Sequence, residues 1–235
     1  MLFRSDNPDV VLSVFYVYYQ PMKHDKPKVY GIGNPLIDII VQVSDEDLSQ
    51  LGIHKGTMHL IDAQRRSNLL SYFSNKEFSY SCGGSCPNTI ITLASLGITT
   101  TLAGMVGNDE FGVIYQKRLK ELKVGDELAF CDQPTGSSII LISPDSERTM
   151  NTYLGANRLY SRECVVGQTI RDADFFHFTG YMWDTQLQKA AVTLALEIAK
   201  ESGTKISFDI ADPFAVARNR DTFLELIDRK STRLK

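Results

Sequence analysis

Apolar runs typical of buried strands alternate with helical runs along this chain of 235 residues. The strand-like runs cover 28–32, 99–106, 174–179 and 205–209, and helical patterns occupy 88–96, 109–122, 185–202 and 220–227. Such alternation predicts a mostly parallel sheet with helices on both faces, an αβα arrangement of three layers. With 43% hydrophobic residues, a chain of this length can bury most of its apolar surface in one large domain.

Short extended runs near 36–61 and 130–154 do not fit this alternation. Two of them form a hairpin pattern around a polar turn at 145–147. We therefore predict an α/β fold in which a small β lid stands beside the mostly parallel central sheet.

A glycine pair marks the first candidate site. Residues 82–88 read Cys-Gly-Gly-Ser-Cys-Pro-Asn, and an apolar helical run to residue 96 and Gly97 follow them. The glycines allow backbone amides to approach a ligand, and the helix start adds unpaired N–H groups. The Asn88 amide both donates and accepts hydrogen bonds, which suits a polyhydroxylated ligand better than a bare anion. The alternative is a buried helix that follows a simple glycine turn.

A second candidate site lies at the end of the first strand, where residues 31–38 read Gly-Ile-Gly-Asn-Pro-Leu-Ile-Asp. A dinucleotide-binding turn would need a third glycine where Leu36 stands, and a helix immediately after it. The pattern instead favours a strand end that presents Asn34 and Asp38, because one carboxylate can accept two hydroxyl hydrogen bonds from a vicinal diol. The alternatives are a turn asparagine with a surface aspartate, and an NAD-dependent oxidoreductase.

Together, these motifs resemble the ribokinase-like (PfkB) carbohydrate and nucleoside kinases, and most of all their adenosine-kinase branch. The resemblance covers about residues 28–228, with its elements in family order. It implies that the sugar is oriented by Asn34, Asp38, Gly83, Gly84 and Asn88.

The resemblance also implies roles for residues further along the chain. Arg148, at the hairpin turn, would offset charge on the transferred phosphoryl group, although such an arginine is often simply solvated. Met150 and Leu154 would help line the pocket. Tyr181 and Phe214 each follow a predicted strand and would sandwich a purine base, the alternative being ordinary core packing.

One further element matches the family, and a short strand adds a candidate residue of the lid. Residues 107–112 read Gly-Asn-Asp-Glu-Phe-Gly, in which Asp109 is expected to cap a helix and so to act structurally. Thr57 and His59 alternate on one strand, and one of them is expected to face the base from the lid.

The activity implied by the resemblance is ATP-dependent, Mg²⁺-dependent phosphorylation of a primary hydroxyl, either of a nucleoside, with adenosine first, or of a free sugar such as ribose or fructose. The family's later Asn-x-x-Glu element and its Asp-x-x-Gly-Ala-Gly-Asp segment, which carries the catalytic base, do not occur in this sequence. We therefore expect a C-terminally truncated kinase that carries the substrate-binding half, inactive alone, or a binding module without catalysis. Its sheet should end in an uncovered apolar edge.

The expected organisation has three parts. Residues 1–27 form an N-terminal extension, 28–228 the kinase part, and 229–235 an aberrant basic tail. The apolar run at 10–19 is too short to span a bilayer.

Net charge and residue composition limit the kinds of partner that the chain is expected to bind. The net charge of −3 argues against nucleic acid, and no membrane partner is expected. The four cysteines form no CxxC pair and the four histidines show no metal-ligand spacing, so no metal site and a cytoplasmic location with free thiols are predicted. The chain is expected to be a monomer or a homodimer joined through the lid.

Overall fold

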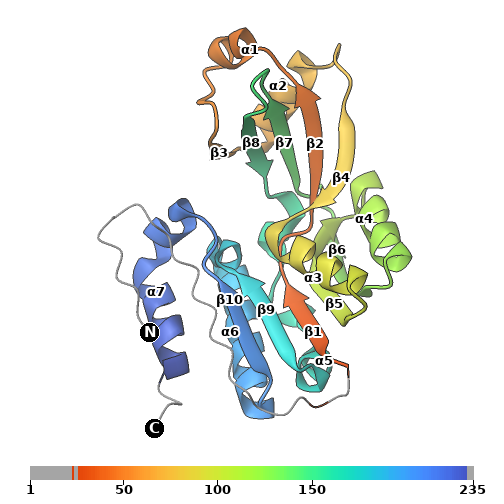
Figure 1. Ribbon diagram of the computed structural model, residues 1–235, viewed down its shortest axis with the longest axis vertical. Helices are drawn as coiled ribbons and strands as arrows, with labels where there is room; N and C mark the ends of the chain where they lie inside the picture. The colour runs from red at the N-terminus through yellow and green to blue at the C-terminus, as the bar shows by residue number, and fades with distance from the viewer. Residues whose placement is uncertain (1–22, 24–25, 232–235) are drawn as a thin grey trace.

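The computed structural model describes residues 23 and 26–231 and contains two five-stranded sheets (Figure 1). The first sheet has the strand order β10-β9-β1-β5-β6. Its strands are β1 (Lys28–Ile32), β5 (Thr99–Gly107), β6 (Gly125–Cys131), β9 (Phe175–Thr179) and β10 (Lys205–Asp209). Every neighbouring pair is parallel, which confirms the predicted central sheet.

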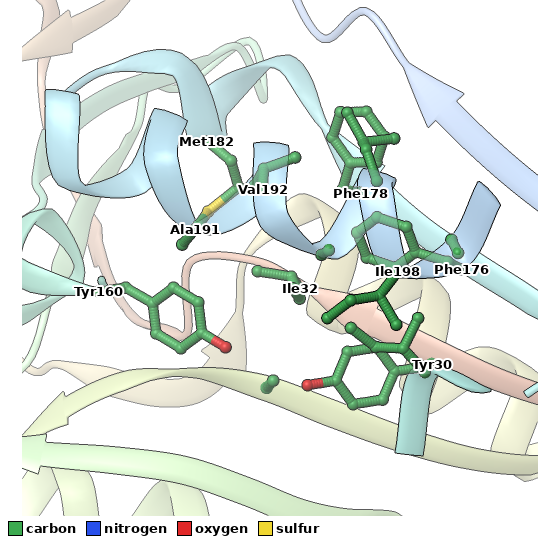
Figure 2. Packing of buried hydrophobic residues seen from close by; sticks show 14 of the residues in the cluster. Tyr30, Ile32, Tyr160, Phe176, Phe178, Met182, Ala191, Val192 and Ile198 are labelled. Atoms are coloured by element: carbon green, nitrogen blue, oxygen red, sulfur yellow. The ribbon is translucent and has the colours of Figure 1, made fainter. Parts of the chain in front are cut away.

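Helices cover both faces of this sheet, so the three predicted layers are present. On one face lie α3 (Ser85–Ser95) and α4 (Glu110–Glu121), whose buried side chains share a core with β1 and β5. On the other face, α5 (Gly167–Asp172) and α6 (Gln186–Ser202) pack over a second cluster. Figure 2 shows the rings of Tyr30, Phe176 and Phe178 in this second cluster, packed with α6.

The second sheet is the expected lid, with the strand order β3-β8-β7-β2-β4. Its strands are β2 (Leu36–Gln42), β3 (Met58–Leu60), β4 (Ser79–Gly83), β7 (Ser137–Ile142) and β8 (Arg148–Tyr153), and two helices accompany it, α1 (Asp45–Gln50) and α2 (Ala63–Tyr72). Alternate residues of β2 and β7 form a core with α1 and α2. The residues between them therefore point to the opposite face of the lid. Figure 1 shows the lid standing at one end of the molecule, beyond the first sheet.

Side-chain caps begin several helices, including the one predicted at Asp109. Ser44 caps α1 through a reciprocal capping box with Asp47, and Asp62 caps α2. Asp109 caps α4, and its carboxylate also accepts hydrogen bonds from the amide and hydroxyl of Thr135. Residues 107–112 therefore have the predicted structural role and also fix the loop that enters the lid.

The glycines at the end of β1 serve helix packing. A Cβ on Gly31 would lie 2.5 Å from the Ile90 side chain, and one on Gly33 would lie 2.6 Å from Cys86. Strand β2 follows directly, without a helix. Both observations argue against the dinucleotide-binding alternative, because these glycines are needed where α3 crosses β1.

Three features differ from the prediction. Strand β6 was not expected, because Asp126 and Glu127 interrupt its pattern and leave an apolar run of only residues 128–131. Residues 130–131 therefore belong to the main sheet and not to the lid. Three short 3₁₀ segments were also not predicted: η1 (Gly155–Leu159), η2 (Arg162–Cys164) and η3 (Gly180–Trp183).

Helix α7 (Pro213–Ser231) is longer than the predicted 220–227 and bends at Asn219. Its backbone includes 229–231, so this part of the expected tail is helical, and residues 232–235 lie outside the described residues. Of the expected N-terminal extension, residues 1–22 and 24–25 also lie outside the described residues. Among the described residues, no helix is long and apolar enough to cross a membrane.

Candidate functional site

The candidate site lies where the carboxyl ends of β1, β9 and β10 meet the base of the lid. Asn34 follows β1, Tyr181 follows β9, and Asp209 ends β10. The hydroxyl of Ser85, in the first turn of α3, donates to Asp209 Oδ2 at 3.5 Å, which places the start of this helix at the same edge. Ligands of parallel α/β proteins bind at this edge, so the fold brings the predicted residues to the expected end of the sheet.

Asp38, Gly83 and Gly84 form the most tightly packed part of the site. A Cβ on Gly83 would overlap the Asp38 carboxylate, so this carboxylate lies directly over the Gly83 backbone. Gly84 has φ +106°, and a Cβ there would overlap the backbone oxygen of Asn34. The glycine pair is therefore required by contact with two residues of the other candidate motif.

The Asp38 carboxylate is available to a ligand. It is half-buried on β2, and within the described part of the chain its oxygens accept no hydrogen bond. Burial raises its pKa from 3.8 to about 6, and the positive charge of Arg148 opposes this rise. A partly desolvated carboxylate without donors gains strongly from hydroxyl groups that donate to it.

Asn34 is placed differently from the prediction. Its side chain is buried, its Oδ1 accepts from Gln188 Nε2 at 2.9 Å, and its Nδ2 donates to the Tyr181 backbone oxygen at 3.4 Å. Gln188 also donates to the Asn157 backbone oxygen at 2.9 Å. Asn34 thus joins the end of β1 to η3 and α6, and its acceptor oxygen already receives one hydrogen bond.

Asn88 is exposed and lines a cavity of about 450 Å³ between β4, α3 and α4. The cavity is also lined by Ile37, Tyr80, Ser81, Cys82, Ile91, Ile114, Lys117, Arg118 and Glu121. Ser81 is the cross-strand neighbour of Asp38, whereas Ile37 and Cys82 form the next pair and point to the other face of the lid, and Asp38 does not line this cavity. No contact within the described structure joins Asn88 to Asp38 directly.

Register assigns lid residues to the face that carries Asp38. Asp38 pairs with Ser138, which pairs with Thr152, and directly opposite residues share a face. Arg148 and Met150 alternate with Thr152 on β8 and so lie on this face, and the half-buried Leu154 follows the strand. The structure therefore brings the predicted lid residues to the side of the carboxylate.

The expectation for Thr57 and His59 is wrong. His59 pairs with Asn151, which lies on the opposite face of the lid, and its ring bonds the Thr57 hydroxyl at 2.7 Å. Met58 is the cross-strand neighbour of Met150 and therefore lies on the face of the lid that carries Asp38, the face expected for Thr57 or His59. The three-residue strand carried too little pattern in the sequence to fix which side chains face the site.

The two predicted aromatic residues are not ordinary core residues. Tyr181, in η3, is half-buried, and its hydroxyl donates to Asp212 Oδ2 at 3.1 Å; burial, with the Asp212 carboxylate beside it, raises its pKa well above the usual range. Phe214, in the first turn of α7, is 51% exposed, and the Arg218 guanidinium lies 4.3 Å from its ring centroid. Asp212 caps α7 through the amide of Ala215, at 2.7 Å.

These contacts connect the two ends of the site. They run from Asp38 over the glycine pair to Asn34, from there to Tyr181, and through Asp212 to the turn that carries Phe214. Sequence reasoning missed Gln188 and Asp212. Gln188 stands three residues after Thr185 and signals only a capping box, whereas Asp212 reads as a helix cap; neither pattern indicates a second partner.

The described residues do not fit a resident Mg²⁺ ion. Among them, no three His, Cys, Asp or Glu side chains form a group that could hold a metal. Asp209 and Asp212 lie at the sheet edge, but each already accepts a backbone hydrogen bond, from Ala211 and Ala215 respectively.

Comparison with known proteins gives consistent results. Residues 56–234 match the profile of the pfkB family carbohydrate kinases. The crystal structure of adenosine kinase from Sinorhizobium meliloti has a TM-score of 0.79 at 36% identity, covering 86% of this chain and 62% of that one. A probable sugar kinase from Rhizobium etli CFN 42 has the same TM-score at 34% identity, covering 86% and 61%.

The curated relatives include sugar kinases. Probable fructokinase-2 from Arabidopsis thaliana is 28% identical over 170 residues, which are 71% of this chain and 51% of the relative. The chain thus spans about half the length of the curated relatives it matches.

Fold and site define the class of protein: an α/β domain whose candidate ligand site lies between a parallel sheet edge and a β lid. The family profile covers most of the chain, and the chain belongs to the pfkB family of carbohydrate kinases. The resemblance drawn from the motifs is thereby confirmed.

Proposed function

We propose that the complete protein transfers the γ-phosphoryl group of ATP to a primary hydroxyl of a nucleoside, with adenosine as the first candidate, and that this chain carries the substrate-binding half. The observation that carries the proposal is the continuous series of contacts from the donor-free Asp38 carboxylate to the half-buried Tyr181 and the exposed Phe214. A diol acceptor at one end and aromatic rings at the other match the two parts of a nucleoside. The likeness to adenosine kinase from Sinorhizobium meliloti supports the same choice.

Each residue then has a role in binding and orientation. The ionised Asp38 accepts hydrogen bonds from two sugar hydroxyls while the backbone of Gly83 and Gly84 borders the sugar. Arg148, on the same face of the lid, offsets negative charge near the hydroxyl that receives the phosphoryl group. ATP supplies the phosphoryl group; this chain's part is to hold the sugar hydroxyl in place and exclude water.

A free sugar such as fructose or ribose is the second candidate. The curated relatives favour it, since they include probable fructokinases and a ribokinase. A free sugar would use Asp38 and the glycine pair but would not need Tyr181 or Phe214. The two candidates therefore differ at one end of the site only.

Equilibrium binding separates the candidates without requiring catalysis. We would titrate the chain with adenosine, ribose and fructose by calorimetry and repeat the titrations with Tyr181→Ala and Phe214→Ala. A nucleoside site predicts adenosine binding that weakens by about tenfold in each variant, since stacking contributes about 1 kcal/mol beyond burial. Sugar binding that neither variant alters, without adenosine binding, would assign the free-sugar function.

A phosphoryl-transfer assay addresses the remaining alternative, a binding module without catalysis. Labelled ATP and the bound substrate would be incubated with the chain. Product formation would contradict the binding-module alternative. The cytoplasm is the compartment we propose for this reaction.

A further inference from the structure

Two side-chain bridges join the segments that carry Tyr181 and Phe214. The first is the hydrogen bond from the Tyr181 hydroxyl to Asp212. The second is the ion pair between Asp184 and Arg218, with 3.1 Å between Oδ1 and Nη1. Asp184 follows η3 directly, and Arg218 lies in α7 one helical turn after Phe214, so the bridges tie both aromatic segments together at two points.

Asp184 is well placed to hold Arg218 still. Its side chain is only 10% exposed, and its second oxygen pairs with Arg158 Nε at 3.2 Å. Arg158 belongs to η1, the segment that leaves the lid after β8. A largely buried carboxylate shared by two guanidinium groups has both oxygens engaged and little freedom to move.

This anchoring determines which surface of Phe214 a ligand can use. The Arg218 guanidinium covers one face of the ring, at 4.3 Å from its centroid, while about half of the Phe214 side chain stays exposed. A ring that a cation already holds on one face loses little freedom when a flat ligand stacks on its open surface.

We propose that Asp184 and Arg218 are positioning residues that set the affinity of this site for a planar, uncharged aromatic base. The inference rests on the proposed nucleoside function and adds to it the residues that fix the base-binding end. Arg218 acts through the Phe214 ring, and Asp184 acts through Arg218. Neither residue touches the sugar end, where Asp38 and the glycine pair lie.

The test compares two arginines of the same helix. Arg218→Gln removes the cation over Phe214, whereas Arg220→Gln removes the same charge from an exposed residue with no partner among the described residues. We expect Arg218→Gln and Asp184→Asn to weaken adenosine binding by about three- to tenfold, because a Phe214 ring that is no longer held must be ordered when the ligand binds. Ribose binding, and adenosine binding by Arg220→Gln, should stay unchanged.

A ligand-free readout checks the positioning itself. Trp183 is the single tryptophan, adjoins Asp184 and is 6% exposed, so acrylamide quenching of its fluorescence reports on the packing of this segment. Both bridge variants should increase the quenching, and Arg218→Lys, which keeps the charge, should restore the wild-type quenching while only partly restoring adenosine affinity.

The outcomes separate the inference from the function on which it rests. If wild type binds adenosine and Arg218→Gln binds it equally well, the positioning role is wrong and the nucleoside function stands. If Arg218→Gln weakens ribose and adenosine alike, the residue is merely structural and the inference is also overturned. If wild type binds no adenosine, both the nucleoside function and the base-positioning role fail.

Discussion

The two ends of the candidate site are built in different ways. At the end that we propose binds the sugar (the sugar end), Asp38 and Asn34 lie so close to the glycine pair that a single methyl group on Gly83 or Gly84 would overlap them. At the end that we propose binds the base (the base end), Tyr181 and Phe214 are half-buried or exposed, and hydrogen bonds and ion pairs between side chains hold their segments.

The difference predicts unequal tolerance to change. Backbone packing at the sugar end leaves no room for adjustment, because the neighbouring atoms belong to the backbone or to short side chains. The base end can adjust, because long and partly solvated side chains make its contacts. Substitutions should therefore have large and general effects at the sugar end, and small effects that depend on the ligand at the base end.

The largest effect is expected for Gly84→Ala. The new Cβ meets the Asn34 backbone oxygen, and φ +106° is unfavourable for any residue with a side chain, so we expect unfolding to become easier by roughly 3 kcal/mol. Urea denaturation measures this change. Gly97→Ala is the control, because Gly97 has φ +83° with open space around it and should cost only about 1 kcal/mol. Equal costs would show that contact with Asn34 is unimportant.

Asp38→Asn should separate binding from stability. We expect the dissociation constant of the bound sugar or nucleoside to rise by about 30-fold, since a charged acceptor contributes about 2 kcal/mol more than a neutral one here. Stability at pH 7 should not fall, because the substitution removes a desolvated charge. Calorimetric binding and thermal unfolding test the two statements; a large loss of stability would mean that Asp38 is structural.

The pH dependence follows from the raised pKa of Asp38. Between pH 3.8 and about pH 6, the Asp38 carboxyl of the folded chain holds a proton that the unfolded chain has released. The contribution of Asp38 to the free energy of unfolding therefore falls as the pH rises through that range. Binding of hydroxyl groups needs the carboxylate, so affinity should rise over the same range.

Arg148→Gln tests the source of this pH dependence. Loss of the positive charge should move the midpoint of the affinity profile above pH 6, because Arg148 opposes the rise of the Asp38 pKa. Lys120→Gln removes an exposed charge from α4 and is the control that should leave the midpoint unchanged. Identical shifts in both variants would indicate only an effect of net charge.

Tyr181→Phe should give the smallest effect. It removes one hydrogen bond of a half-buried hydroxyl, so we expect adenosine binding to weaken by about two- to threefold and sugar binding to stay the same. Tyr72→Phe, which removes an exposed hydroxyl bond to Gln50 in the lid, is the matched control. A tenfold or larger loss of sugar affinity in Tyr181→Phe would remove the distinction between the two ends.

Much of the sugar end could be predicted from local sequence. The glycine pair, Asp38 and the capped helices are short motifs whose chemistry and backbone needs are carried by neighbouring residues. The base end could be predicted only as two aromatic residues after two strands. Its bridges join residues about 30 positions apart, from Tyr181 to Asp212 and from Asp184 to Arg218, and no local pattern marks such pairs.

The sequence by itself determined the alternation of strands and helices, the parallel sheet, the lid, and the short motifs that hold Asp38, Gly83 and Gly84, because hydrophobic periodicity, caps and glycines act over a few residues. Only the tertiary structure decided that Asn34 is engaged by Gln188, that Met58 and not His59 shares the face of Asp38, and that Arg218 covers Phe214. Those outcomes depend on strand register and on helix placement, which arise from packing across the whole chain.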